Sequence, residues 1–192
     1  MKLRGLYAIT PDGVDPAKVR LALEGGIALL QYRNKRRDRD HGAAIVEMAK
    51  AYGVPVIVND DIDLALELGA QGAHLGRDDG DLKAARQKLG GRLLGASCYN
   101  DVRLARAAVA EGADYVAFGS VFASPTKPGA VRAPLSLFGD SLGVPLCAIG
   151  GITLQNAREV IKAGADLLAV ISDLFEATDI RARAADYGKL FR

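Results

Sequence analysis

The sequence predicts an α/β protein of the (β/α)8, or TIM barrel, type, and three observations support this prediction. The 192-residue chain is 49% apolar and 25% charged, a composition typical of one globular domain with an ordinary core. Short apolar runs alternate with helical stretches eight times along the chain. Phrases also recur between the two halves, as in Gly53-Val-Pro-Val-Ile-Val and Gly143-Val-Pro-Leu-Cys-Ala. Eight similar units favour a closed barrel, with residues 1–192 forming a single compact domain.

The strands and helices of this barrel are expected at regular intervals. The runs rich in Val, Ile, Leu and Ala, typical of parallel strands buried on both faces, cover residues 2–10, 27–33, 54–60, 72–76, 92–98, 114–121, 144–150 and 167–172. The helices are expected over residues 16–25, 41–52, 62–69, 81–89, 100–111, 135–142, 153–163 and 180–190. Asp15, Asn100 and Thr153 are the expected N-caps of three of these helices.

The length of the chain bears on the fold as well. It lies just below the usual size of a (β/α)8 barrel, so we expect shortened helices. The stretch 135–142 is barely two turns long, and Gly139 interrupts it. An open, doubly wound sheet is the alternative fold. It requires a glycine-rich turn after the first strand, for which Ile9-Thr-Pro-Asp-Gly13 is a weak candidate.

Charge and cysteine content narrow the classes of function. The net charge of +2 is spread along the chain and gives no basic field that would attract nucleic acid or an anionic membrane. Cys98 and Cys147 lack the spacing of a disulfide framework or a zinc site. The first residues do not resemble a signal peptide, and no apolar run is long enough to span a membrane. We therefore expect a cytoplasmic protein; the sequence leaves open whether it forms a homo-oligomer.

In a (β/α)8 barrel the reactive groups gather at the carboxyl ends of the strands. The residues expected there are mainly phosphate binders and ligands for hard metal ions: Gln31, Arg33, Lys35, Asn59, Asp60, Asp61, Arg77, Asp78, Asp79, Ser97, Ser124, Thr126, Lys127, Gly150, Gly151 and Ser172. Neither histidine lies at such a position, which argues against triad hydrolysis and against a histidine metal site. For His41 and His74 we expect structural or solvent-exposed roles.

Two carboxylates follow neighbouring strands. Asp60 follows the third strand and Asp79 the fourth, so their oxygens are expected to meet over one cation. Mg²⁺ suits one or two carboxylates completed by water and substrate phosphate. The alternative is that Asp60 and Asp61 cap the helix that starts near Ile62, and that Asp79 or Asp81 caps the next one.

Further groups suggest anion binding. Gln31, Arg33 and Lys35 alternate, which in an extended strand end points all three into the barrel mouth. The neighbouring arginines are expected in solvent: Arg36, Arg37 and Arg39. Gly150-Gly151 and Ile171-Ser172 follow the last two strands, where such barrels often hold a phosphate on backbone N–H groups. A tight turn explains the glycines equally well when they are taken alone. In the stretch 123–128 two hydroxyls and an ammonium favour binding over a simple proline turn.

Taken together, these motifs resemble those of the thiamine phosphate synthase family. The motifs, in the family's order, are Gln31-x-Arg33-x-Lys35, Asn59-Asp60-x-x-Asp63-Leu-Ala, His74-Leu-Gly-x-x-Asp79, Pro125-Thr-Lys-Pro128, Ala148-Ile-Gly-Gly-Ile152 and Val170-Ile-Ser172. The residues that depart from the family's usual pattern are Arg77, Ser124, Cys98 and Tyr99. The resemblance implies a transferase of thiamine biosynthesis that joins hydroxymethylpyrimidine diphosphate to thiazole phosphate. Its products are thiamine phosphate and pyrophosphate, and its cofactor is Mg²⁺.

The resemblance also implies a role for each matching residue. It assigns to the pyrimidine diphosphate Gln31, Arg33, Lys35, Asn59, Ser97 and Lys127, of which Arg33, Lys35, Ser97 and Lys127 are the implied catalytic residues. It assigns Asp60 and Asp79 to the metal, and to the thiazole phosphate Ser124, Thr126, Gly151, Ile171 and Ser172. The implied step is dissociative and carbocation-like, because the pyrimidine's amino group supplies electron density to its methylene carbon. The nucleophile is a neutral ring nitrogen, so no general base is required.

Three alternatives belong to other classes of function. A thiazole tautomerase on the same barrel usually lacks the second metal carboxylate and the Thr-Lys pair, and it uses a histidine near the position of Tyr99. A non-catalytic protein that binds thiazole phosphate would need no metal. A sugar-phosphate epimerase or aldolase needs a base or a Schiff-base lysine inside the barrel, and the predicted strand interiors contain no lysine.

Overall fold

The computed structural model describes residues 3–123, 129 and 131–192. Its eight strands form one closed parallel barrel in sequence order. They are β1 (Gly5–Ile9), β2 (Leu29–Tyr32), β3 (Val56–Asn59), β4 (Gly72–Leu75), β5 (Leu93–Tyr99), β6 (Tyr115–Gly119), β7 (Leu146–Ile149) and β8 (Leu167–Val170). The pairing of β1 with β8 closes the barrel. This topology confirms the predicted (β/α)8 barrel and excludes the open, doubly wound sheet.

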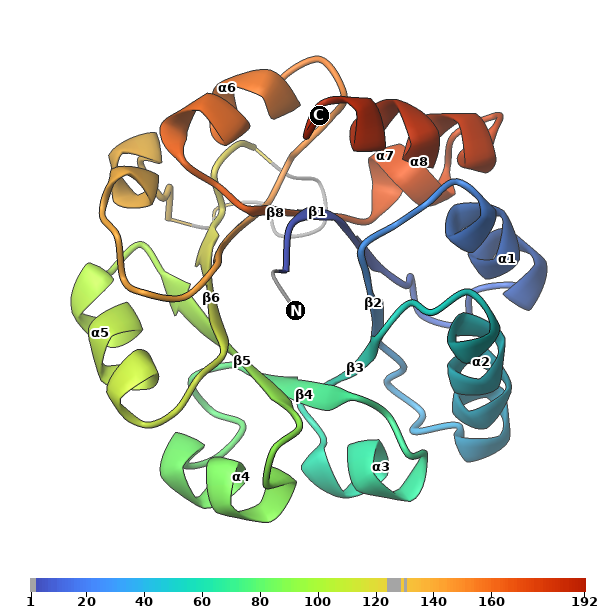
Figure 1. Ribbon diagram of the computed structural model, residues 1–192, viewed down its shortest axis with the longest axis horizontal. Coiled ribbons are helices and arrows are strands. Elements are labelled where there is room, and N and C mark those ends of the chain that lie inside the picture. The colour runs from blue at the N-terminus through green and yellow to red at the C-terminus, as the bar shows by residue number, and fades with distance from the viewer. Residues whose placement is uncertain (1–2, 124–128, 130) are drawn as a thin grey trace.

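Helices form a ring around the barrel (Figure 1). They are α1 (Pro16–Glu24), α2 (Arg39–Ala51), α3 (Ile62–Glu67), α4 (Leu82–Leu89), α5 (Val102–Ala110), the 3-10 helix η1 (Leu135–Gly139), α6 (Ala157–Ala163), α7 (Ser172–Phe175) and α8 (Ile180–Lys189). The prediction of shortened helices is confirmed. The sixth unit contains a single 3-10 turn where a helix was expected over residues 135–142, and α7 was not predicted.

The expected N-caps are confirmed at one of three positions. The Asp15 carboxylate accepts a hydrogen bond from the N–H of Ala17 and caps α1. The prediction for Asn100 is wrong by one residue, because Asp101 caps α5 by accepting from the N–H of Arg103. The prediction for Thr153 is also wrong. The segment after Thr153 first forms a turn, so α6 begins at Ala157.

Two apolar clusters stabilise the barrel. The larger one lies between the strands and the surrounding helices. The smaller one fills the barrel interior, with Tyr7, Leu29, Ile57, Tyr115 and Leu167 among its members. Among the described residues, the buried polar side chains other than tyrosines are those of Thr10, Gln31 and His74. Polar groups are rarely buried without hydrogen-bond partners, so the partners of these side chains give information about the site.

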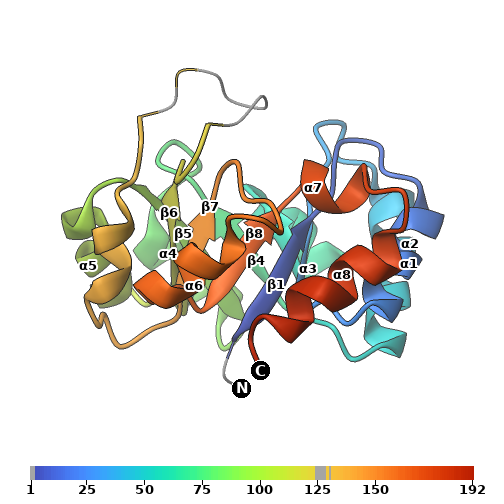
Figure 2. The same ribbon diagram turned by 90° about the horizontal axis from the view of Figure 1, so that it is seen from above.

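The parallel strands bring all their carboxyl ends to one face, which is the upper face in Figure 2. The short helix α7 and the segment between β2 and α2 lie at this rim. Within the described part of the chain, no helix is long and apolar enough to cross a membrane.

Candidate active site

Two side chains of the segment after β1 hold the basic segment after β2. The Thr10 hydroxyl accepts a hydrogen bond from the N–H of Arg33 at 2.9 Å and donates to its carbonyl oxygen at 3.3 Å. The Asp12 carboxylate accepts from the N–H of Lys35 at 2.8 Å. Thr10 is fully buried, so its two bonds anchor Arg33 to the barrel, and the bond of Asp12 holds Lys35 at the surface. Their backbones are therefore fixed at the rim.

The end of β3 presents Asp60 in an unusual conformation. Its φ of 61° lies in the left-handed region, which costs a residue other than glycine roughly 1 kcal/mol or more. The N–H of Asp60 donates to the carbonyl oxygen of His74 at 2.8 Å, which ties this conformation to β4. The side-chain amide of Asn59 donates to the Asp60 carboxylate. Strained backbone held by neighbouring bonds is frequent at functional sites.

The Asp60 carboxylate faces Asp79 from the next unit. Burial, followed by a hydrogen bond and charge repulsion from Asp79, raises the pKa of Asp60 to about 6, against smaller opposing effects of Asn59 and Arg33. The Asp79 carboxylate also accepts from the N–H of Gly76 at 2.7 Å. A Cβ atom at position 76 would lie 2.7 Å from that same oxygen, so glycine leaves the space that Asp79 occupies.

Two neighbouring aspartates, Asp61 and Asp81, cap the helices α3 and α4. Asp61 accepts from the N–H of Leu64 at 2.9 Å and caps α3. Asp81 accepts from the N–H of Ala84 at 2.7 Å and caps α4. Helix capping thus accounts for Asp61 and Asp81, whereas Asp60 and Asp79 meet each other.

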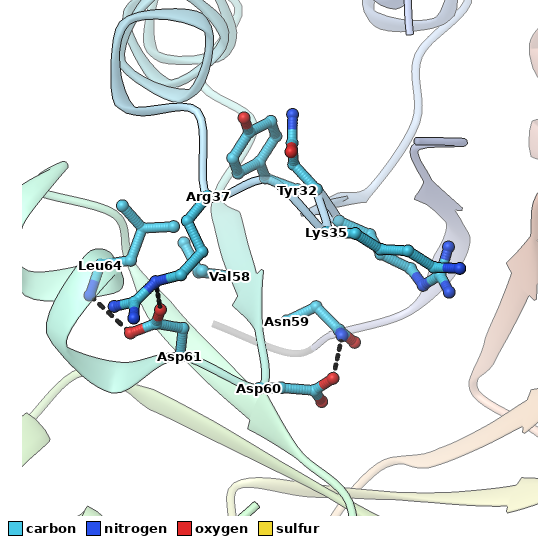
Figure 3. A pocket seen from close by; sticks show the side chains of 10 residues that line it. Tyr32, Lys35, Arg37, Val58, Asn59, Asp60, Asp61 and Leu64 are labelled. Atoms are coloured by element: carbon cyan, nitrogen blue, oxygen red, sulfur yellow. Dashed lines mark hydrogen bonds and ion pairs between the residues drawn. The ribbon is translucent and has the colours of Figure 1, made fainter. Parts of the chain in front are cut away.

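A cleft of about 320 Å³ opens beside these groups (Figure 3). Its lining residues are Tyr32, Arg33, Asn34, Lys35, Arg37, Val58, Asn59, Asp60, Asp61 and Leu64. Lys35 and Asp60 extend to one side of the end of β3, while Arg37 and Asp61 meet on the other side (Figure 3). The cleft therefore places lysine and arginine side chains beside a carboxylate at one rim of the barrel.

The three arginines expected in solvent are exposed, and two of them also form ion pairs. Arg37 forms an ion pair with Asp61, and Arg39 forms one with Glu67 at 3.1 Å. Both arginine side chains are more than half exposed, so each pair contributes little stability. The Arg37 pair nevertheless ties the segment after β2 to the start of α3. No local pattern in the sequence indicates this pair, because the partners lie on different units.

The donor set suits a hard divalent cation. In residues 3–123, 129 and 131–192, no cluster of three or more His, Cys, Asp or Glu side chains is suited to hold a metal ion. The meeting of Asp60 and Asp79 supplies two carboxylates. Two carboxylates completed by water and substrate phosphate fit Mg²⁺, whereas an all-protein cage would be expected for Ca²⁺.

Gln31 and Ser97 lie apart from the cleft. Gln31 is buried in the barrel interior, where its amide donates to the hydroxyl of Tyr7 at 2.7 Å. Ser97 lies on β5 and is hydrogen-bonded to His74 at 2.9 Å. The expected grouping of Gln31 with Arg33 and Lys35 therefore holds only for the last two, which follow the end of β2 at Tyr32 and line the cleft.

The carboxyl ends of β7 and β8 form another part of the rim. Gly150 and Gly151 have φ values of 103° and 61°, which favour glycine. A Cβ atom at position 151 would collide with the carbonyl oxygen of Ala123, so the backbone of residues 150–151 packs closely against the segment after β6. Ile171 precedes α7, and Ser172 is its first residue. The predicted residues Ser124, Thr126 and Lys127 lie outside the described residues.

Fold and site together define a class. This is a (β/α)8-barrel enzyme whose site, at the carboxyl ends of its strands, offers lysine and arginine side chains and paired carboxylates. The family model described as thiamine monophosphate synthase matches residues 6–174. The chain belongs to that family, and it is a transferase of thiamine biosynthesis, as the resemblance implied.

Individual relatives agree with this assignment. The chain is 57% identical to a protein named thiamine-phosphate synthase from Aromatoleum aromaticum, over 99% of this chain and 97% of the relative. It is 52% identical to a protein of the same name from Chromobacterium violaceum, over 95% of this chain and 94% of the relative. A solved structure described as thiamine phosphate pyrophosphorylase from Pyrococcus furiosus superposes with a TM-score of 0.87 at 32% identity. It covers 99% of this chain and 96% of that one.

A more distant structure shares the barrel alone. A protein described as 3-hexulose-6-phosphate synthase superposes with a TM-score of 0.74 at 19% identity, covering all of both chains. Such a likeness reflects the common fold and does not assign an activity.

Proposed function

We propose that this chain transfers hydroxymethylpyrimidine from its diphosphate to the ring nitrogen of thiazole phosphate, giving thiamine phosphate and pyrophosphate. The meeting of Asp60 and Asp79 beside Arg33 is the observation that carries this proposal. Paired carboxylates next to a guanidinium suit a substrate that is a polyanion bound together with a divalent cation.

The chemistry needs no proton transfer. The bond between the methylene carbon and the diphosphate oxygen breaks, and its electron pair leaves with the diphosphate. The lone pair of the thiazole nitrogen then forms the new carbon–nitrogen bond. The pyrimidine's amino group supplies electron density to the methylene carbon between these two events. A general base is therefore unnecessary, in agreement with the positions of the two histidines, since His74 lies within β4 and His41 lies in α2.

The negative charge of the departing diphosphate determines which residues contribute to catalysis. Arg33 and Lys35 donate hydrogen bonds and positive charge to it. The further residues proposed to bind the pyrimidine diphosphate substrate are Gln31, Asn59, Ser97 and Lys127. Positive groups placed where negative charge develops typically give the largest contribution to catalysis. Mg²⁺, held by Asp60 and Asp79, supplies further positive charge to the diphosphate when it is bound.

The thiazole phosphate occupies the opposite part of the rim in this proposal. Its phosphate accepts hydrogen bonds from the backbone at Gly151, Ile171 and Ser172, with Ser124 and Thr126 as further ligands. The close packing of Gly151 and its positive φ support this role, because a bound anion requires backbone N–H groups that are accessible and fixed. The two substrates thus approach each other across the barrel mouth.

A reconstitution experiment tests the proposal. Purified protein is mixed with both phosphorylated heterocycles, with and without Mg²⁺, and thiamine phosphate and pyrophosphate are measured together. We expect equal amounts of both products, and only when Mg²⁺ is present. In a parallel incubation with a thiazole carboxylate precursor, isomerisation of that precursor would show a tautomerase instead. Binding of thiazole phosphate without product would show a non-catalytic binding protein.

We also propose that the protein lies in the cytoplasm. Cys98 and Cys147 are buried free thiols, and burial raises the pKa of Cys98 to about 12. Unreactive, unpaired cysteines support a reducing compartment, which is the cytoplasm.

A further inference from the structure

Five side chains form a continuous line of hydrogen bonds through the barrel interior. The Gln31 amide lies 2.7 Å from the Tyr7 hydroxyl, which lies 2.8 Å from the Tyr115 hydroxyl. That hydroxyl lies 3.0 Å from Nδ1 of His74, and Nε2 of His74 lies 2.9 Å from Oγ of Ser97. The line crosses from β1 and β2 to β4, β5 and β6, on the opposite side of the barrel (Figure 1). We call these five residues the interior chain.

All members of the interior chain are neutral near pH 7. Burial disfavours a charged imidazole at His74, whose two ring nitrogens both face hydroxyl groups, so this imidazole carries a single proton there. Burial also raises the pKa values of Tyr7 and Tyr115 well above their ordinary value, so both phenols keep their hydrogens. The position of every polar hydrogen in the interior chain then follows from counting donors and acceptors.

Counting donors and acceptors gives one direction for the hydrogen bonds of the interior chain. Because the Gln31 amide donates to Tyr7, the Tyr7 hydroxyl is free to donate to Tyr115, and Tyr115 donates to Nδ1 of His74. The single imidazole proton then sits on Nε2 and is donated to Ser97. If the proton sat on Nδ1 instead, one phenol hydrogen would find no acceptor among the described residues, and a buried hydrogen bond left unmade is costly. Reversal of the line would require the Gln31 amide, both phenols and the imidazole to change together.

The packing around the interior chain leaves room for the contact between Tyr115 and His74. Gly95 on β5 pairs in register with both His74 and Tyr115, which lie on the two neighbouring strands. A Cβ atom at position 95 would collide with the Tyr115 ring and hydroxyl and with Nδ1 of His74. Glycine at this position leaves the space in which Tyr115 and His74 meet. No buried side-chain nitrogen or oxygen in the described part of the chain lacks a hydrogen-bond partner.

We propose that His74, supported by Tyr115 and Tyr7, is a positioning residue that holds Ser97 as a hydrogen-bond donor toward the pyrimidine diphosphate and couples it to Gln31. The Ser97 oxygen already accepts from His74, so its own hydrogen is directed elsewhere. Ser97 is half-buried at the end of the line, whereas the other four members are buried. This inference rests on the proposed function, because both ends of the line are residues assigned to the same substrate.

The imidazole proton can be located without any substrate. The chain has two histidines, so a protein labelled with ¹⁵N-histidine gives two sets of imidazole signals, and His41→Asn assigns them. We expect a neutral His74 with its proton on Nε2 at pH 7. We also expect Tyr115→Phe to change the ¹⁵N shift of Nδ1, because that nitrogen loses its donor. A proton on Nδ1 in the unaltered protein would overturn the proposal.

Kinetics then test the link to Ser97. His74→Leu is expected to lower kcat about tenfold, because one oriented donor is lost. His74→Gln is expected to restore most of this loss, since a glutamine amide also accepts from Tyr115 and donates to Ser97. In the Ser97→Ala background, His74→Leu should have almost no further effect on kcat. Independent, multiplying losses would show that His74 has a structural role only.

The tyrosines provide the second variant and its control. Tyr115→Phe is expected to lower kcat about tenfold, because His74 loses the donor that fixes its tautomer. Tyr187→Phe removes another buried hydroxyl, which donates to Asp173 at 2.7 Å outside the barrel interior, and is expected to leave kcat within about twofold. Equal losses in the two variants would contradict the proposal. If the unaltered protein makes no thiamine phosphate, the proposed function fails, and the imidazole measurement still decides the direction of the interior chain.

Discussion

Two parts of the barrel rim use different groups. The charged rim, above β2 to β4, presents side chains of both signs: Arg33, Lys35, Asn59, Asp60 and Asp79. The backbone rim, after β7 and β8, offers glycines and the start of a short helix: Gly150, Gly151, Ile171 and Ser172. A leaving diphosphate gains negative charge during the reaction, whereas a phosphate that stays on the thiazole does not. Changes in the charged rim should therefore alter kcat, and changes in the backbone rim should alter KM.

The largest effect is expected from removing both carboxylates. Asp60→Ala combined with Asp79→Ala should lower pyrophosphate release by at least about a hundredfold, because the diphosphate loses its divalent cation. Binding of thiazole phosphate, measured by calorimetry, should change less than about twofold, since the backbone rim is intact.

The matched control for the double variant is Asp140→Ala, which removes an exposed carboxylate that lies 3.9 Å from Arg106 of α5 and belongs to neither rim. It should keep full activity. Undiminished pyrophosphate release by the double variant would show that Asp60 and Asp79 do not bind the metal.

A smaller effect is expected from changing one cationic side chain of the charged rim, that of Arg33. Arg33→Lys keeps the charge but loses the planar fork that binds two phosphate oxygens, so kcat should fall by roughly tenfold to a hundredfold. Steady-state kinetics with both substrates varied measure this loss. Arg36→Lys changes an exposed neighbour and should leave kcat unchanged. A rise in the KM for thiazole phosphate, with kcat unaltered, would place Arg33 at the other substrate.

The backbone rim is tested at Gly151. Gly151→Ala introduces a Cβ atom against the carbonyl oxygen of Ala123 at a φ of 61°, so the backbone must shift. We expect the KM for thiazole phosphate to rise by about tenfold, while the KM for pyrimidine diphosphate stays the same. Gly53→Ala has a similar φ of 68° but meets open space, and it controls for the strain alone. Equal effects of the two variants on KM would remove the phosphate role from Gly151.

Local signals in the sequence were sufficient for the barrel and for most of the charged rim. Strand ends are marked by a change from apolar to polar residues, and the carboxyl ends of parallel strands meet at one face. Asp60 and Asp79 could therefore be expected to meet. The distinction between them and the capping aspartates, Asp61 and Asp81, required the structure, because all four follow a strand and precede a helix.

Long-range contacts were not accessible in the same way. The ion pair of Arg37 and Asp61 joins two units, and nothing in the local sequence of either residue indicates the other. Tyr7 and Tyr115 are 108 residues apart and meet in the barrel interior. Their strands are buried on both faces, so no alternation of apolar and polar residues shows which side chains point inward. A tyrosine in an aliphatic strand was the available signal, because its hydroxyl requires a partner.

The smallest effect is expected beneath the charged rim, in the dependence of stability on pH. Burial holds the pKa of His74 near 4, below the value of 6.5 that it has when unfolded. The unfolded chain therefore binds the proton more readily between these values. This contribution to stability is present above pH 6.5 and is lost as the pH falls toward 4.

His74→Gln removes this titration. From pH 7 to pH 5.5 the unaltered protein should lose about 1 kcal/mol of its unfolding free energy relative to the variant. Thermal unfolding of both proteins at each pH measures this difference, which corresponds to a shift of roughly 2–4 °C. No comparable change is expected between pH 7 and pH 8, because both forms of His74 are then neutral. A difference that stays constant down to pH 5.5 would mean that burial does not hold His74 neutral.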